Sequence, residues 1–292
     1  MQEEEALSRT RHRVIARRTA ALVLVVAALA APSVAQATLT IGSNLGRAPE
    51  GAPSSYGCSP PCTFTQATLA ADRQAAGGIV SPVNGTVVLW RIRAAGASSS
   101  TALRVIKHLS GGLVTGGGTS ATVTPALNSL SVYGTQLPIA IGDSIGIDCC
   151  HPSSQYFLLS GGTISVWNPT LADSGPGRAI IGPGDPHEIT LNAEIEPTSA
   201  FTLLTAKPRK GGKIKVTVNL PNPGRLSATG KGLHSHTTSV PAAGPFTLIV
   251  KPYFVTKRKL ADGKKVKRNL KLTFTPTGGT AVAQAVKVKL KR

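Results

Sequence analysis

The chain has 292 residues, with 32 Lys and Arg against 13 Asp and Glu, so its formal net charge is +19. Hydrophobic residues make up 41% of the chain, and its 31 Gly and 21 Pro fall short of the roughly 25–30% that indicates low-complexity disorder. A wholly disordered chain is therefore excluded. Four cysteines and 4% aromatic residues also exclude a dense disulfide scaffold and a protein rich in aromatic binding platforms.

The first 37 residues have the pattern of a secretory signal peptide. An apolar run, Ala20–Ala31, is followed by the small-residue site Ala35-Gln36-Ala37. The run is shorter than the roughly 20 residues that a spanning helix needs, so an uncleaved anchor is the weaker interpretation. Five arginines precede it: Arg9, Arg11, Arg13, Arg17 and Arg18. We expect a secreted mature chain, extracellular or cell-wall associated, with no transmembrane span.

Charge divides the mature chain into two blocks. Residues Thr38–Pro197 hold 7 Lys and Arg and 9 acids, whereas Thr198–Arg292 hold 20 Lys and Arg and a single acid, Asp262. The change coincides with Glu194–Pro197 and predicts a domain boundary there. We therefore expect domains at 38–197 and 198–292, called the N-terminal and C-terminal blocks below.

Both blocks are predicted to be all-β. In the N-terminal block, short runs of β-type residues recur between Gly, Pro, Ser and Asn turns, which is typical of a jelly-roll-like β-sandwich. The expected strands are Thr86–Arg93, Ala102–Lys107, Leu137–Ile141, Ser144–Asp148, Thr163–Trp167 and Ile189–Ile195.

The C-terminal block shows cleaner alternation. Lys213–Val218 and Val286–Lys291 place apolar side chains on one face and mostly lysines on the other, and Leu270–Phe274 alternates likewise. No segment keeps a helical period. This pattern predicts a small antiparallel sandwich of the immunoglobulin-like type.

Several segments carry a resemblance to a group of proteins. Thr40–Leu45, Ser81–Arg93 and Gly142–Asp148 are similar to segments of uncharacterised exported two-domain β-proteins of high-GC Gram-positive bacteria. Pro223–Gly232 and Thr273–Thr280 resemble a Lys-rich β module at the C-termini of such proteins. The resemblance implies export and an all-β build, and it implies no activity and no catalytic residues.

The four cysteines are Cys58, Cys62, Cys149 and Cys150. Export favours disulfides, and four cysteines allow three pairings. An adjacent Cys149–Cys150 bridge would form a strained ring, so we expect links from the first pair to the second. Each would close a loop of about ninety residues and stabilise the fold by roughly 4 kcal/mol. A zinc site of the four thiolates, or of three with His151, is the weaker alternative, because C-x3-C and vicinal cysteines suit tetrahedral coordination poorly.

Three further motifs suggest chemistry without completing a site. Gly142–Ile145 superficially matches the nucleophile block of a lipase-like hydrolase with Ser144 as nucleophile, but a Gly-Asp turn between strands is the simpler interpretation. His234-Ser235-His236 and Asp185-Pro186-His187-Glu188 could hold a cation, yet a solvated loop and a turn explain them better. We predict no catalytic residue, no metal and no cofactor.

Aromatic residues offer one alternative function, carbohydrate binding by the N-terminal block. Trp90 alternates with apolar neighbours and is expected in the core, whereas Trp167, beside Asn168-Pro169, is expected to be exposed as a sugar platform. Tyr156 is a further candidate.

The basic tail is the strongest signal. Solubility needs a net charge of about 2–8, and +19 on one domain far exceeds that, although lysines can also serve only to protect sheet edges. We expect a non-enzymatic, envelope-associated protein that binds anionic wall polymers or polysaccharides. Nucleic acid is not the expected partner, because no groove-entering helix is visible and few aromatics are spare for stacking. The predicted binding residues are Lys257, Arg258, Lys259, Lys264, Lys265, Lys267, Arg268, Lys287, Lys289 and Lys291.

Overall fold

The computed structural model describes residues 38–50, 61–95, 99–149, 156–158, 160–180 and 186–291. The fold is all-β, with 59% strand and, among the described residues, one short α-helix. Every pair of named neighbouring strands is antiparallel. The predicted all-β class is therefore confirmed. No described helix is long and apolar enough to cross a membrane. The signal peptide predicted over residues 1–37 lies outside the described residues.

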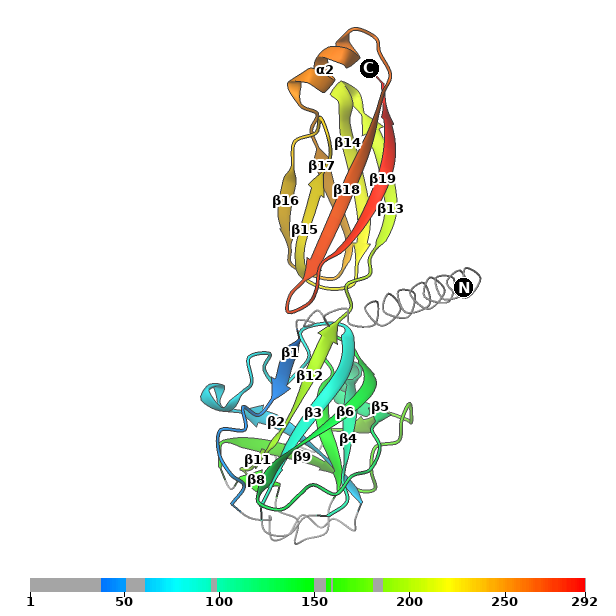
Figure 1. Cartoon of the computed structure of the whole chain (residues 1–292). Helices are drawn as coiled ribbons and strands as arrows, with labels where there is room; N and C mark the ends of the chain where they lie inside the picture. The colour runs from blue at the N-terminus through cyan, green and yellow to red at the C-terminus, as the bar shows by residue number, and fades with distance from the viewer. Residues whose placement is uncertain are drawn as a thin grey trace, which may run out of the picture. The chain divides into compact units, whose positions relative to one another are not determined.

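Two larger sheets and one two-stranded sheet form the N-terminal block (Figure 1). The four-stranded sheet has the order β1 (Leu39–Gly42), β12 (Leu191–Pro197), β3 (Gly85–Ala94), β6 (Ser129–Ile139). The six-stranded sheet has the order β10 (Arg178–Ala179), β5 (Leu113–Thr119), β4 (Ala102–His108), β7 (Ser144–Cys149), β2 (Cys62–Leu69), β9 (Gly162–Trp167). The two-stranded sheet pairs β11 (Glu188–Ile189) with β8 (Phe157–Leu158).

The core of the N-terminal block lies between these sheets. Trp90 is 1% exposed, as predicted, and its ring packs on Tyr133 at a centroid distance of 4.9 Å. Phe64 and Phe157 meet edge to face at 5.4 Å. Each of the six predicted strands overlaps an observed strand, and the ends of β3, β4, β7 and β9 differ from the predicted ends by at most one residue. The prediction for Leu137–Ile141 is the least accurate, because β6 begins at Ser129 and ends at Ile139. The predicted strand Ile189–Ile195 is divided in two, since β11 ends at Ile189 and β12 begins at Leu191.

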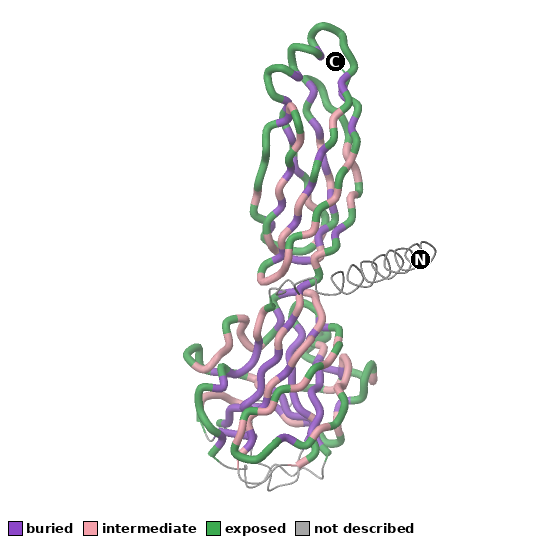
Figure 2. Tube along the Cα trace, in the orientation of Figure 1, coloured by how far each residue is buried: buried purple, intermediate pink, exposed green. Residues whose placement is uncertain are grey.

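Two sheets and the helix form the C-terminal block. The apolar halves of its alternating strands point inward: in β14, Ile214, Val216, Val218 and Leu220 are all buried, as the sequence pattern predicts (Figure 2). The three-stranded sheet has the order β13 (Thr202–Arg209), β14 (Lys213–Leu220), β17 (Gly244–Val250). The four-stranded sheet has the order β16 (His236–Val240), β15 (Gly224–Thr229), β18 (Val266–Pro276), β19 (Val282–Leu290).

Helix α2, Phe254–Ala261, was not predicted from the sequence. It buries Thr256 and Leu260, one turn apart, and leaves its other side chains exposed. A turn at Asp262-Gly263 follows it directly, with Gly263 at φ +74°. That backbone conformation is in the left-handed region that glycine adopts without strain.

Candidate polyanion-binding surface

Cations face each other across strands β18 and β19. Lys267 lies opposite Lys289, and Asn269 lies opposite Lys287. Directly opposed residues of an antiparallel pair point to the same face, and both lysines of the first pair are exposed, as is Lys287. Lys271, two residues beyond Asn269 and four beyond Lys267 on β18, continues the same face. A row of like charges of this kind opposes strand pairing.

The other sheet repeats the arrangement. On β13 and β14, Lys207 lies opposite Lys215 and Arg209 lies opposite Lys213, joined by the turn Lys210–Gly212. All except the partly buried Lys215 are exposed. Both sheets therefore present cross-strand pairs of cations to solvent.

Helix α2 is held against this hairpin. A Cβ on Gly212 would lie 2.4 Å from Leu260 Cδ1, so the glycine lets the Leu260 side chain pack closely against the turn of the hairpin. On the other side, the Thr256 hydroxyl donates to Gly232 O (2.8 Å) and accepts from Arg268 Nη2 (2.8 Å). A shallow cavity of about 350 Å³ between helix and hairpin is lined by Gly211, Gly212, Lys213, Lys257, Leu260 and Ala261.

These contacts gather cations from separate segments at one end of the block, where Figure 1 shows α2 beside the C-terminus. We call this surface the basic end. It comprises Arg209, Lys210, Lys213, Lys251, Lys257, Arg258, Lys259, Lys264, Lys265, Lys267 and Lys289, all of them exposed.

Acidic groups do not neutralise the basic end. Asp262 is the single acid after Pro197. Among the described side chains, the ion pairs lie in the N-terminal block, such as the buried pair of Arg104 with Asp148. A concentration of unpaired charge creates an attractive field for anions that reaches about 8 Å into physiological salt.

The structure places nine of the ten predicted binding residues on the surface; the tenth is different. Arg268 is half-buried, and its guanidinium is bonded to Thr256 and to Lys267 O (3.1 Å). Its position beneath α2 makes it a support for the helix. Sequence reasoning missed four cations of the basic end, Arg209, Lys210, Lys213 and Lys251, although the predicted alternation of Lys213–Val218 already placed Lys213 on an outer face.

The expectation that Trp167 is exposed is wrong. Trp167 is 1% exposed, and its indole Nε1 donates to Ala179 O at 2.9 Å. Tyr156 is also buried, with its hydroxyl donating to Ser99 O. Strand β10 shields the Trp167 ring from solvent. Because β10 has only two residues, the sequence shows no alternation that would predict it. Neither ring presents a face to a sugar.

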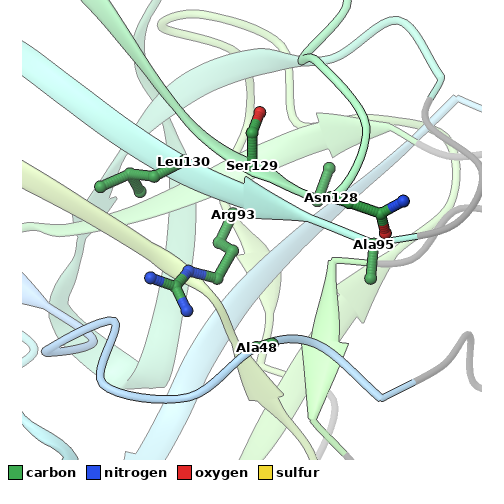
Figure 3. A pocket seen from close by; sticks show the side chains of 7 residues that line it. Ala48, Arg93, Ala95, Asn128, Ser129 and Leu130 are labelled. Atoms are coloured by element: carbon green, nitrogen blue, oxygen red, sulfur yellow. The ribbon is translucent and has the colours of Figure 1, made fainter.

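A small cavity of about 260 Å³ lies beside β3 and β6 (Figure 3). Its polar groups include the Arg93 guanidinium and the Asn128 amide, and none of the described residues that line it is aromatic. Its size is below the roughly 300–1,000 Å³ of typical ligand sites. The lining residues are Ala48, Arg93, Ala94, Ala95, Asn128, Ser129 and Leu130.

Ser144 has a histidine partner that the sequence did not indicate. His108 Nε2 lies 3.0 Å from Ser144 Oγ. Ser144 is, however, 2% exposed at the start of β7, and the Asp143 carboxylate accepts the backbone N–H of Ala140 (2.9 Å), so it closes the turn. Desolvation raises the pKa of Asp143. The turn predicted at Gly142-Asp143 is confirmed, and this geometry gives a substrate no access to the serine.

The other candidate motifs are dispersed. Cys62 and Cys149 are buried, lie opposite each other on β2 and β7, and neither is a free thiol. Cys58, Cys150 and His151 lie outside the described residues, so the pairing stays a prediction. No group of three or more His, Cys, Asp or Glu side chains in the described chain could hold a metal ion.

The acidic motif near residue 188 also has a structural role. Glu188 is buried and accepts the Ser43 hydroxyl and the Arg73 guanidinium, and burial raises its pKa. Asp185 lies outside the described residues.

In the His234-Ser235-His236 motif, the His234 ring stacks on the Tyr253 ring with the ring centroids 4.0 Å apart.

Comparison with known proteins adds no family: no protein-family model and no curated protein matches this chain. The resemblance to exported β-proteins therefore stays a prediction.

Proposed function

We propose that this chain is a secreted, non-enzymatic protein of the cell envelope whose C-terminal block binds anionic wall polymers by electrostatic attraction. The observation that carries the proposal is the set of opposed cations on both sheets, Lys267 with Lys289 and Arg209 with Lys213, in a block with one acid. Solubility requires no such opposition, because lysines spaced further apart would serve it equally well.

The finer fold assignments belong to the same proposal. In the N-terminal block the successive strands β1 to β7 alternate between the two sheets except at the β4–β5 hairpin, and the first strand pairs with the last, β12. That order supports a jelly roll with additional edge strands. In the C-terminal block, seven strands divide into three and four, with the first, second and fifth in one sheet, which supports an immunoglobulin-like sandwich.

Such folds host many unrelated activities, so the fold itself names no ligand. Jelly rolls include lectin domains, but the carbohydrate alternative depended on Trp167, which is buried. The charge arrangement is therefore a better guide to function than the fold.

The test is retention of the full mature chain on immobilised poly(glycerol phosphate) at rising salt. We expect retention to fall steeply between about 0.05 and 1 M salt, because the attraction is screened. Replacing Lys257, Lys259, Lys264 and Lys265 together with Gln should weaken retention by more than about tenfold. The matched control replaces the same four with Arg, which keeps the charge and should keep the binding. Salt-insensitive retention, or equal retention of the Gln variant, would contradict the proposal.

A further inference from the structure

Three consecutive residues at the start of α2 expose apolar side chains within the basic end. Tyr253 is 48% exposed, Phe254 73% and Val255 62%. Phe254 is the most exposed large apolar side chain in the described part of the protein. We call these three residues the apolar tip.

The helix geometry aims the tip outward. Successive residues of an α-helix are about 100° apart around its axis. With Thr256 and Leu260 facing the core, Phe254 and Arg258 fall on the opposite side, flanked by Val255. The outermost surface of α2 is thus a mixture of apolar and cationic side chains.

The backbone before the helix is fixed, so the tip is held in place. The Tyr253 N–H donates to Gly232 O (3.0 Å), and the His234 N–H donates to Lys251 O (2.8 Å). Stacking of His234 on the Tyr253 ring leaves Phe254 and Val255 as the projecting side chains.

We infer that the apolar tip inserts into the interface of an anionic lipid bilayer while the surrounding cations hold its headgroups. An apolar side chain gains free energy by entering the acyl boundary, and each Lys or Arg near an anionic surface adds an attraction equivalent to about fivefold in affinity. Tyr is enriched at the headgroup level of membranes because its ring is apolar and its hydroxyl is polar. The tip offers apolar side chains and the polar hydroxyl of Tyr253 beside the cations of the basic end.

Charge complementarity alone would equally admit a soluble polyanion, but the tip distinguishes the partners. A phosphate polymer surrounded by water provides no apolar phase for Phe254 and Val255. A nucleic acid would use several stacking rings along a groove, whereas the Tyr253 ring is already stacked on His234. A lipid interface matches both the cations and the apolar side chains.

This inference extends the proposed function, because the same cations supply the attraction. The two fail separately: Phe254→Ala removes the insertion and leaves every charge in place. We expect this variant to bind vesicles of phosphatidylcholine with about one-third phosphatidylglycerol roughly tenfold more weakly than the wild type. Its retention on poly(glycerol phosphate) should be unchanged. The matched control is Leu204→Ala, also an exposed apolar residue (49%), on β13 and about 20 Å along the strand from the hairpin.

Insertion can be observed directly with a tryptophan probe. The native Trp90 and Trp167 are each 1% exposed and remain away from lipid. A Phe254→Trp variant should shift its emission to the blue on the anionic vesicles and be quenched by brominated acyl chains, whereas Leu204→Trp should show neither effect. Vesicles of phosphatidylcholine alone should bind little of either protein.

Several results would overturn the inference. If the emission of the Phe254→Trp variant stays solvent-like on bound protein, the protein adsorbs to the surface without insertion. Equal vesicle binding of Phe254→Ala means that the tip contributes nothing. If the alanine variant loses single-stranded DNA binding and keeps vesicle binding, the tip is a stacking platform. If it changes only the sedimentation of the protein alone, the tip is a contact between copies. If the wild type binds neither the anionic vesicles nor poly(glycerol phosphate), the proposed function is refuted as well.

Discussion

The opposed lysines of β18 and β19 make a quantitative prediction possible. Lys267 and Lys289 face each other on an exposed surface, and a like-charged cross-strand pair costs about 0.2–1 kcal/mol. Replacing Lys267 with Glu removes that repulsion and adds an attraction of similar size. We therefore expect Lys267→Glu to stabilise the C-terminal block by about 1 kcal/mol at low ionic strength while it weakens polyanion binding.

A control with the same change in charge is available on the same strand. Lys271 lies opposite Ala285, not opposite a cation. Lys271→Glu changes the net charge by the same amount, and residue 271 lies on the same face of the sheet, so its effect on polyanion binding should be similar. Its gain in stability should be small, because no cross-strand cation lies directly opposite the new carboxylate.

The assay is urea unfolding at about 0.02 and 0.5 M salt, followed by far-UV circular dichroism. Both tryptophans, Trp90 and Trp167, lie in the N-terminal block, so their fluorescence monitors a part of the chain that these substitutions do not touch. The gain of Lys267→Glu should shrink at high salt. If this variant is no more stable than the wild type, or if Lys271→Glu gains equally, cross-strand repulsion is not a feature of this surface.

The remaining predictions concern the N-terminal block. Asp148→Asn leaves the buried Arg104 guanidinium without its main charged partner and should destabilise the block by about 3 kcal/mol, measured as a lower urea midpoint; an unchanged midpoint contradicts the ion pair. Burial raises the pKa of Glu188 above its ordinary value of 4.5, so the folded state holds this proton more tightly than the unfolded state. Stability contributed by this group should therefore fall as pH rises from about 4.5 through the raised pKa, and Glu188→Gln should flatten that slope. Trp90 and Trp167 should emit in the blue, resist acrylamide quenching and ignore added polysaccharide, since both are 1% exposed; a polysaccharide-dependent change would revive the carbohydrate alternative.

Strand prediction succeeded where one face of the strand is buried and the other is exposed to solvent. Lys213–Val218 and Leu270–Phe274 were predicted from alternation, and β14 and β18 contain them with the expected faces. Period two is a strong signal in such strands because each apolar side chain has a core to enter. The ends were less accurate, since hydrogen bonding extends strands into residues that have no pattern.

The features that depend on distant segments were not predictable. Helix α2 is a single short element with two buried residues, too few to produce a helical period. Distant residues hold it in place: Leu260 packs closely against Gly212, and the Thr256 hydroxyl donates to the carbonyl oxygen of Gly232. The burial of Trp167 has the same origin, since only the tertiary fold brings Ala179 over it. Exposure of an isolated aromatic residue cannot be judged from its neighbours in sequence.

Charge has two different uses in this chain, and the difference determines how function can be detected. In the N-terminal block the Arg104 guanidinium is enclosed by Asp148 and Asp173, so one substitution should have a large effect. Within the C-terminal block no ion pair joins the described side chains, and attraction arises from the sum of many charges. Removing one Lys then changes affinity by only about fivefold, while removing several multiplies the effect. A scan that replaces one cation at a time would therefore find no residue with a dominant effect on polyanion binding, and grouped neutralisation with a charge-preserving control is the design that this surface requires.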